Sequence, residues 1–208
     1  MAYRNGTYIA FHANGTSVPY ESDMKYYNLL KAWNVREECE FEFVNSHDKT
    51  QAVRDSSKKE TLKRVLIERL RNSKNFILII GDTTRDDRDW VPFEIEYAVD
   101  VCRIPIVAAY PEFEAIGDPA RLRPMWPKAL ADRIDNGLAR VVHVPFKQGP
   151  LKASLAKFDV ENLPPSGQTY FGPDSYHQWG LRVPTHGNPN PVKADALLRL
   201  LLKGRLSS

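Results

Sequence analysis

Five consecutive apolar residues, Phe76 to Ile80, place the strongest constraint on the fold of this chain. An apolar run of this length without polar alternation predicts a strand that is buried on both faces, as in a parallel sheet covered by helices. A small polar turn follows at residues 81–84, and an Asp- and Arg-rich loop then leads into a predicted helix at about 90–102. In open α/β sheets, ligands bind where the strands end at their carboxyl edge. The segment therefore predicts a parallel sheet and, directly after this strand, a candidate site.

The same alternation of strands and helices recurs along the first 160 residues. Apolar and β-prone runs predict further strands at 7–11, 41–44, 104–109 and 141–144. Helical periodicity and capping residues predict helices at 22–34, 58–72, 126–135 and 148–158. Strands that alternate with helices form parallel sheets, because a helical crossover returns the chain to the same edge. We therefore expect an α/β fold with a flavodoxin-like, doubly wound, five-stranded parallel sheet and helices on both faces.

A change in composition near residue 160 divides the chain into two parts. Residues 163–191 are rich in Pro, Gly, Asn and aromatic residues, which argues against a regular helix or a central strand. The aromatic side chains in this stretch favour an irregular arm packed on the domain over a flexible linker. A Leu-rich helix is predicted at 193–203. We therefore expect an α/β domain over residues 1–160 and a C-terminal extension over 161–208, whose terminal helix packs on the domain.

Composition and charge exclude several classes of protein. The net charge of the 208 residues is only +3, and basic residues are interspersed with acidic ones, so no nucleic-acid-binding stripe is expected. Cys39 and Cys102 lie far apart and form no motif with histidine, which argues against a zinc site and a disulfide framework. The chain shows neither an N-terminal signal nor an apolar stretch of membrane-spanning length. We therefore expect a soluble cytoplasmic protein that binds no metal, nucleic acid or membrane.

Glu94 is the candidate for chemistry on the helix that follows the buried strand. Phe93, Tyr97 and Val101 share an i, i+4, i+8 stripe that we expect to face the sheet, and Glu94 lies slightly to one side of it. Asp89 is predicted to cap the helix. A carboxylate in the first turns of a helix is also favoured by the macrodipole alone. Position in the sequence therefore leaves both a functional and a purely structural role open for Glu94.

Other side chains at the same edge of the sheet are candidates for ligand contacts. Trp90 either walls a site or caps the core. His12 ends the first strand, where a histidine is more often a hydrogen-bonded structural residue than a ligand contact, and it has no partner at metal-binding spacing. Asn45 follows the second strand in a segment typical of Asx turns as well as of ligand contacts. Asp82 and Thr83 belong to a turn that matches no known phosphate-binding motif but can offer backbone N–H groups.

The order of these segments resembles the TIR-like family of bacterial defence proteins, and most closely the TIR-like subunit of Thoeris antiphage systems. The resemblance covers roughly residues 5–145 and rests on the strands YIAFHA, NFILIIGDTT and IPIVAAY and on the pattern W-x-x-x-E-I-E-x-A from Trp90. It implies a flavodoxin-like fold and cleavage of the nicotinamide–ribose bond of NAD, which is then a substrate and not a cofactor. It also implies that the glutamate of the third helix, Glu94, is the essential catalytic residue.

The Thoeris branch further implies a cyclic or otherwise modified ADP-ribose signal that activates a separate effector protein after a phage component has been sensed. Many TIR active sites form between two subunits, which implies a homo-oligomer as the active form. Bond cleavage of this kind passes through an oxocarbenium-like state that a nearby carboxylate stabilises. Tyr110 is a further candidate for an aromatic wall. The candidate substrate-binding residues are Phe11, His12, Asn45, Asp82, Thr83 and Trp90.

Two other functions are compatible with the sequence. A non-catalytic TIR-like adaptor would assemble through its loops and helix faces, and Glu94 would then only start a helix. A flavodoxin-like nucleoside hydrolase or deoxyribosyltransferase would also use a glutamate near a strand end on N-glycosidic bonds. Assembly without NAD turnover would indicate the adaptor, and turnover of free nucleosides with NAD untouched would indicate the nucleoside enzyme.

Overall fold

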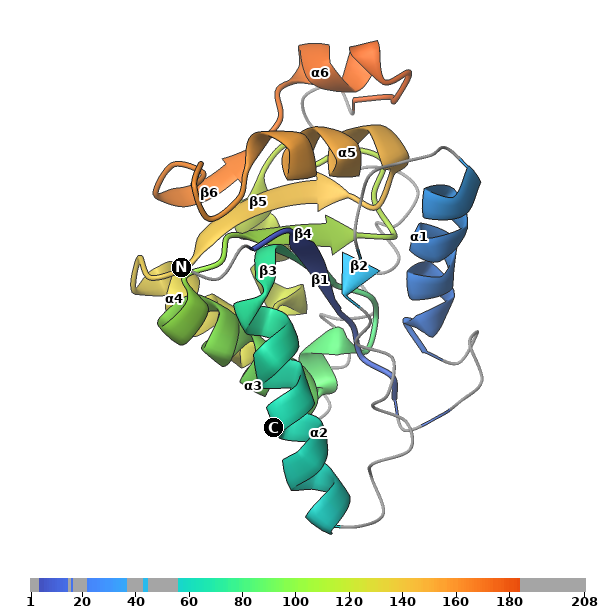
Figure 1. Cartoon of the computed structure of the whole chain (residues 1–208). Helices are drawn as coiled ribbons and strands as arrows, with labels where there is room; N and C mark the ends of the chain where they lie inside the picture. The colour runs from blue at the N-terminus through green and yellow to red at the C-terminus, as the bar shows by residue number, and fades with distance from the viewer. Residues whose placement is uncertain (1–3, 15, 17–21, 37–42, 45–55, 184–208) are drawn as a thin grey trace, which may run out of the picture.

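The computed structural model describes residues 4–14, 16, 22–36, 43–44 and 56–183. In that part of the chain, six strands form one sheet in the order β2-β1-β3-β4-β5-β6, and all neighbouring strands are parallel (Figure 1). The strands are β1 (Gly6–Ala10), β2 (Phe43–Val44), β3 (Ser73–Ile79), β4 (Ile106–Tyr110), β5 (Arg140–Pro145) and β6 (Gly167–Tyr170). The order β2-β1-β3-β4-β5 is that of a doubly wound, flavodoxin-like sheet, which confirms the predicted fold class.

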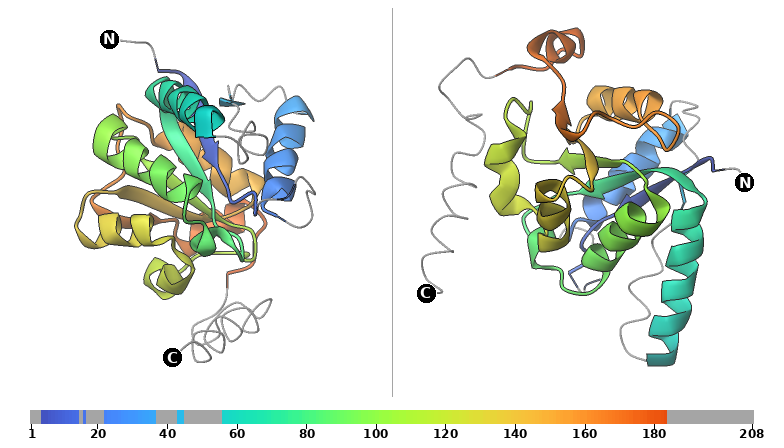
Figure 2. Two further views of the ribbon diagram at one scale, coloured as in Figure 1. Left: turned by 90° about the horizontal axis from the view of Figure 1, so that it is seen from below. Right: turned by 90° about the vertical axis from the view of Figure 1, so that its left-hand side faces the viewer.

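Helices cover both faces of this sheet. They are α1 (Met24–Arg36), α2 (Ser56–Arg71), α3 (Trp90–Glu96), α4 (Lys128–Asp135), α5 (Gln148–Lys157) and α6 (Pro173–Gln178), with a π-helical segment η5 (Tyr97–Cys102) that continues α3 and 3-10 segments η4 (Thr84–Asp86) and η6 (Pro119–Met125). Helices α2, α3 and α4 lie on one face, and α1 and α5 lie on the other (Figures 1 and 2). Up to residue 158, the predicted ends of strands and helices agree with these bounds to within three residues.

The two hydrophobic cores follow from the alternation of side chains along the strands. Tyr8 and Ala10 belong to the core beneath α2, α3 and α4, whereas Ile9 and Phe11 belong to the core beneath α1 and α5. The residues of β3 from Phe76 onward are fully buried and contribute to both cores in turn. The unbroken apolar run at β3 therefore has the physical origin that its sequence indicated, since neither face of the strand meets water.

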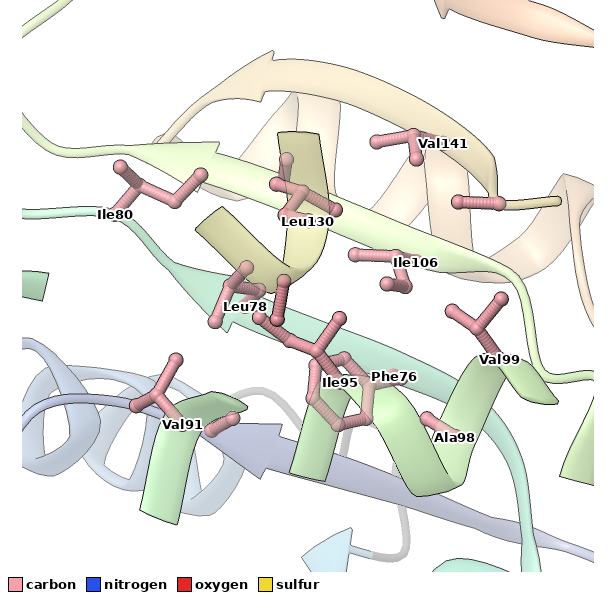
Figure 3. Packing of buried hydrophobic residues seen from close by; sticks show 14 of the residues in the cluster. Phe76, Leu78, Ile80, Val91, Ile95, Ala98, Val99, Ile106, Leu130 and Val141 are labelled. Carbon is pink, nitrogen blue, oxygen red and sulfur yellow. The ribbon is translucent and has the colours of Figure 1, made fainter. Parts of the chain in front are cut away.

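Helix α3 faces the sheet with a different stripe from the predicted one. Val91, Ile95 and Ala98 are fully buried and point toward β3 and β4 (Figure 3). The predicted stripe was wrong at its far end, because Val101 is 57% exposed. The two aromatic residues of the predicted stripe, Phe93 and Tyr97, are only partly buried. They lie beside α2, where Lys63 Nζ is 5.0 Å from the centre of the Phe93 ring and Arg71 donates a hydrogen bond of 2.9 Å to the Tyr97 hydroxyl.

The C-terminal extension contributes a strand and a helix to the described structure. β6 adds to the edge of the sheet beside β5, and α6 lies on the outer side of α5 (Figure 1). The short helix α6 shows that the prediction of no regular helix in 163–191 was wrong for Pro173–Gln178, because Pro173 occupies the first turn, where it needs no N–H. The Tyr176 hydroxyl bonds to the backbone of Ile116, and Trp179 packs against Gly149 of α5. The predicted helix at 193–203 lies outside the described residues.

Arg103 ends the α3–η5 helix in the left-handed conformation, with φ of 54°. A side chain in this conformation is strained by its Cβ, and glycine is not. We expect Arg103→Gly to raise the free energy of unfolding by about 0.5–1 kcal/mol, the strain relieved less the added entropy of the unfolded chain. Chemical denaturation checks this. Arg103→Ala removes the same long side chain but keeps the Cβ, so it should give no gain, and equal effects of the two variants would contradict the prediction.

Candidate functional site

The candidate site lies where β1 and β3 end side by side. These strands are neighbours in register, with Ala10 opposite Leu78, so the segments that follow them meet at the same edge of the sheet. His12 follows β1, and its Nδ1 lies 3.0 Å from the Thr83 hydroxyl in the turn after β3. The structure therefore brings together two of the residues that the sequence placed at strand ends.

His12 also lies close to the start of α3. Its Nε2 is 3.9 Å from Oδ2 of Asp87, and the side chain is 16% exposed. The imidazole thus lies between the turn after β3 and the loop that leads into α3. Of its two ring nitrogens, only Nδ1 is at hydrogen-bond distance from a neighbour among the described residues, the Thr83 hydroxyl.

Asp87 caps α3 in place of the predicted Asp89. Its Oδ1 accepts hydrogen bonds from the backbone N–H groups of Asp89, at 2.9 Å, and Trp90, at 3.0 Å. The Asp89 side chain makes no cap hydrogen bond. The prediction was wrong by two residues because η4 turns the loop so that Asp87 is buried and points back at the free N–H groups of the helix. Asp87 therefore links Trp90, the start of α3 and His12.

Glu94 is fully buried, at 0% exposure, on the side of α3 that faces the sheet. The Tyr8 hydroxyl, from the middle of β1, donates a hydrogen bond of 2.5 Å to Glu94 Oε1. Tyr8 is also fully buried, and its ring stacks on Phe76 at 5.3 Å between centroids. Burial, and next the charge of Glu94, raises the pKa of Tyr8 well above its usual value, so the phenol stays protonated as a donor. A fixed, neutral donor thus holds the candidate catalytic carboxyl group.

Sequence reasoning did not find Tyr8 as a site residue. It lies in an apolar strand and has the appearance of an ordinary core residue. The signal that could have found it is the spacing of two between Tyr8, Ala10 and His12, which places the three side chains in the same direction from the sheet. The polar hydroxyl of a tyrosine buried in this position needs a partner, and Glu94 is that partner.

Asp23 is a second buried carboxyl group at the same edge. It precedes α1, is 4% exposed, and its Oδ2 lies 2.8 Å from the hydroxyl of Thr84. The same hydroxyl accepts a hydrogen bond of 2.8 Å from the N–H of Gly81. A Cβ on Gly81 would lie 2.0 Å from Asp23 Oδ1, so only glycine fits this close approach. Burial raises the pKa of Asp23 to about 6.

The remaining sequence candidates fall in different places. Trp90 is half-buried against the core beneath α3, and Asp82 is exposed in the turn after β3. Phe11 is 2% exposed and stacks on Tyr27 in the core beneath α1, on the opposite face of the sheet from Glu94. Tyr110 is fully buried, with its hydroxyl bonded to His143 and Trp126. The structure does not bring these last two aromatic rings to Glu94, and Asn45 lies outside the described residues.

The described residues show no arrangement suited to a metal ion or to a membrane span. Among these residues, no group of three or more His, Cys, Asp and Glu side chains is arranged to hold a metal ion. None of the helices in the described part combines the length and apolar character needed to cross a membrane.

The Asp87 cap gives a prediction about the stability of α3. We expect Asp87→Ala to lower the free energy of unfolding by about 1 kcal/mol, because two backbone N–H groups lose their acceptor. Asp89→Ala removes the same charge from the same helix end without removing a cap hydrogen bond, so its effect should stay within about 0.5 kcal/mol. Chemical denaturation of both variants checks this, and Asp87→Asn, which keeps an acceptor oxygen, should retain most of the stability. Equal losses in the two alanine variants would contradict the assignment of the cap.

The raised pKa of Asp23 gives a prediction about pH. The folded protein binds more protons than the unfolded chain between the ordinary value of 3.8 and about 6, so the contribution of Asp23 to stability falls as pH rises through this window. Relative to wild type, Asp23→Asn should therefore gain up to roughly 3 kcal/mol in free energy of unfolding between pH 4 and pH 7. Denaturation at several pH values measures this. Asp82→Asn is the matched control for loss of a charge at this edge, and parallel curves for Asp23→Asn and wild type would contradict the prediction.

A comparison with known protein families places the chain. Residues 8–115, just over half of the 208 residues, match the family described as Thoeris protein ThsB, TIR-like domain. The match includes Tyr8, the turn after β3, Asp87 and Glu94, and the doubly wound parallel sheet agrees with it. The resemblance to the Thoeris TIR-like subunit is therefore confirmed, and the chain belongs to the TIR-like ThsB family of Thoeris antiphage defence.

Proposed function

We propose that this protein cleaves the nicotinamide–ribose bond of NAD and forms a cyclic or otherwise modified ADP-ribose signal, with Glu94 as the catalytic residue. The observation that carries the proposal is the complete burial of Glu94. A favourable helix macrodipole is worth about 0.3–1 kcal/mol to an exposed carboxylate. Removing a carboxylate from water costs several kcal/mol. The macrodipole therefore does not account for the position of Glu94, and a role in chemistry does.

The chemistry suits a buried carboxylate. The nicotinamide ring of NAD is a cation, so it leaves as a neutral molecule and needs no general acid. Positive charge develops on the ribose as the bond breaks, and a carboxylate placed against the sugar stabilises that charge. An internal nucleophile of the same substrate, held close while water is excluded, then closes a ring.

The edge around β1 and β3 supplies the groups that we propose to bind the substrate. His12 and Thr83 are held 3.0 Å apart and present polar atoms at this edge. Trp90 begins α3, the helix that carries Glu94, and offers an aromatic surface for a ring of the substrate. Asp82, exposed in the same turn, is placed to accept hydrogen bonds from ribose hydroxyl groups. Asn45 belongs to this proposal from the sequence, whereas the core position of Phe11 supports a packing role instead.

Family membership supports the wider assignment. A Thoeris TIR-like protein acts in antiphage defence. We propose that the ADP-ribose product activates a separate effector protein, that a phage component triggers synthesis in the cytoplasm, and that the active form is a homo-oligomer. NAD is the substrate in this scheme, and no resident cofactor takes part.

The test is the conversion of NAD in lysates of phage-infected cells that express the wild type or Glu94→Gln. The amide keeps the shape of the side chain and an oxygen that accepts from Tyr8, but it lacks the charge that stabilises the transition state. We expect a new ADP-ribose-derived product from the wild type by chromatography and mass spectrometry, and a loss of at least about 100-fold in the variant.

Glu96→Gln is the matched control. Glu96 lies two residues further along the same helix, is exposed, and is 3.8 Å from Arg133. It should keep full activity. Product from Glu94→Gln at the wild-type rate would refute the catalytic assignment. Absence of product from a folded wild type in confirmed infection, together with self-association, would indicate an adaptor.

A further inference from the structure

Glu94 cannot meet a substrate in the arrangement that the structure shows. Its side chain has no exposed surface, and the Tyr8 ring that contacts it is equally buried. A carboxylate that stabilises charge on ribose must lie against the sugar. If Glu94 is the catalytic residue, a conformational step has to bring its carboxyl group to the ligand-binding edge. The contact between Glu94 and Tyr8 is therefore a contact of the resting state.

Tyr8 is the fixed side of this contact. It lies in β1, which pairs with β2 on one side and β3 on the other. Its ring stacks on Phe76 of β3 at 5.3 Å, with the ring planes only 11° apart. A tyrosine in a central strand that is also stacked on its neighbour has little freedom to move. Exposure of Glu94 therefore requires movement of α3 and not of Tyr8.

Helix α3 has the features of a movable side. It is seven residues long and continues into the π-helical segment η5, a geometry that is rare and often found at functional positions. Its first turn depends on a single capping side chain, Asp87, which also lies beside His12 at the ligand-binding edge. A ligand or partner that displaces His12 thus acts next to Asp87, the residue that caps the helix carrying Glu94.

We propose that the Tyr8–Glu94 hydrogen bond is an autoinhibitory latch that holds α3 in a closed state, so that its release sets the rate of NAD cleavage in the resting protein. This inference rests on the proposed function, because it assumes that Glu94 acts on NAD. A buried hydrogen bond between two side chains is costly to lose, because water does not replace the missing partner. The complete burial of the Tyr8–Glu94 contact is what a latch requires, because no water competes for either partner. Without the hydroxyl, Glu94 loses this donor in a site closed to water, and the open state becomes more populated.

The test uses purified full-length protein without any phage component. Tyr8→Phe keeps the ring that stacks on Phe76 and removes only the hydroxyl. We expect the basal rate of NAD consumption to rise about tenfold or more, and hydrogen exchange of the α3 amides to become faster. Tyr8→Phe combined with Glu94→Gln should show the faster exchange without NAD consumption. Tyr176→Phe, which removes another buried hydroxyl from the extension, should change neither quantity at α3.

The outcomes separate the latch from the proposed function. A basal rate for Tyr8→Phe at or below that of the wild type, with Glu94-dependent turnover present in infected lysate, would overturn the latch and leave the function standing. Faster exchange at α3 in Tyr8→Phe, without NAD turnover by any variant, would support the closed contact and refute the function. Faster exchange in Tyr176→Phe to the same extent would also overturn the latch, because general destabilisation would then explain the result.

Discussion

The burial of an ionisable carboxyl group beneath α3 is the physical constraint on which the arrangement of this site depends. Hydration that a carboxylate loses on burial has to be replaced by hydrogen bonds from the protein. The Tyr8 hydroxyl supplies one of them, from β1 across the core beneath α3. The same strand then leads to His12 at the edge of the sheet. The requirements of Glu94 thus fix where the polar groups of the edge lie relative to the helix.

The fold could be predicted because it depends on patterns that extend over many residues. The apolar run of β3 and the alternation of strands with helices specify a parallel sheet without knowledge of any single contact. The face of α3 could not be predicted in the same way, because two overlapping stripes on this helix are apolar. Which one packs on the sheet depends on α2, where Lys63 and Arg71 receive the aromatic rings of Phe93 and Tyr97. Tertiary neighbours decide between stripes of similar hydrophobicity.

The candidate site was predicted to the extent that it lies at strand ends. His12 and Thr83 could be placed at one edge because parallel strands end at the same side of a sheet, and the structure holds them together. Tyr8 and Asp23 could not, because their roles come from partners that are 86 and 61 residues away in the sequence, in Glu94 and Thr84. Side chains that become polar partners only through long-range contacts carry no local signal.

The distribution of buried carboxyl groups separates Glu94 from its neighbours. In the part of the chain that the structure describes, the buried acids are Asp23, Asp87 and Glu94. Asp23 and Asp87 lie where β1 and β3 end, whereas Glu94 contacts Tyr8 in the middle of β1. Asp87 caps a helix, and Asp23 accepts from Thr84 across a glycine that leaves room for it. Both therefore shape the backbone of the edge. Glu94 instead contacts a side chain inside the core, where an apolar residue would make the folded protein more stable. The proposed catalytic role accounts for a carboxyl group in this position.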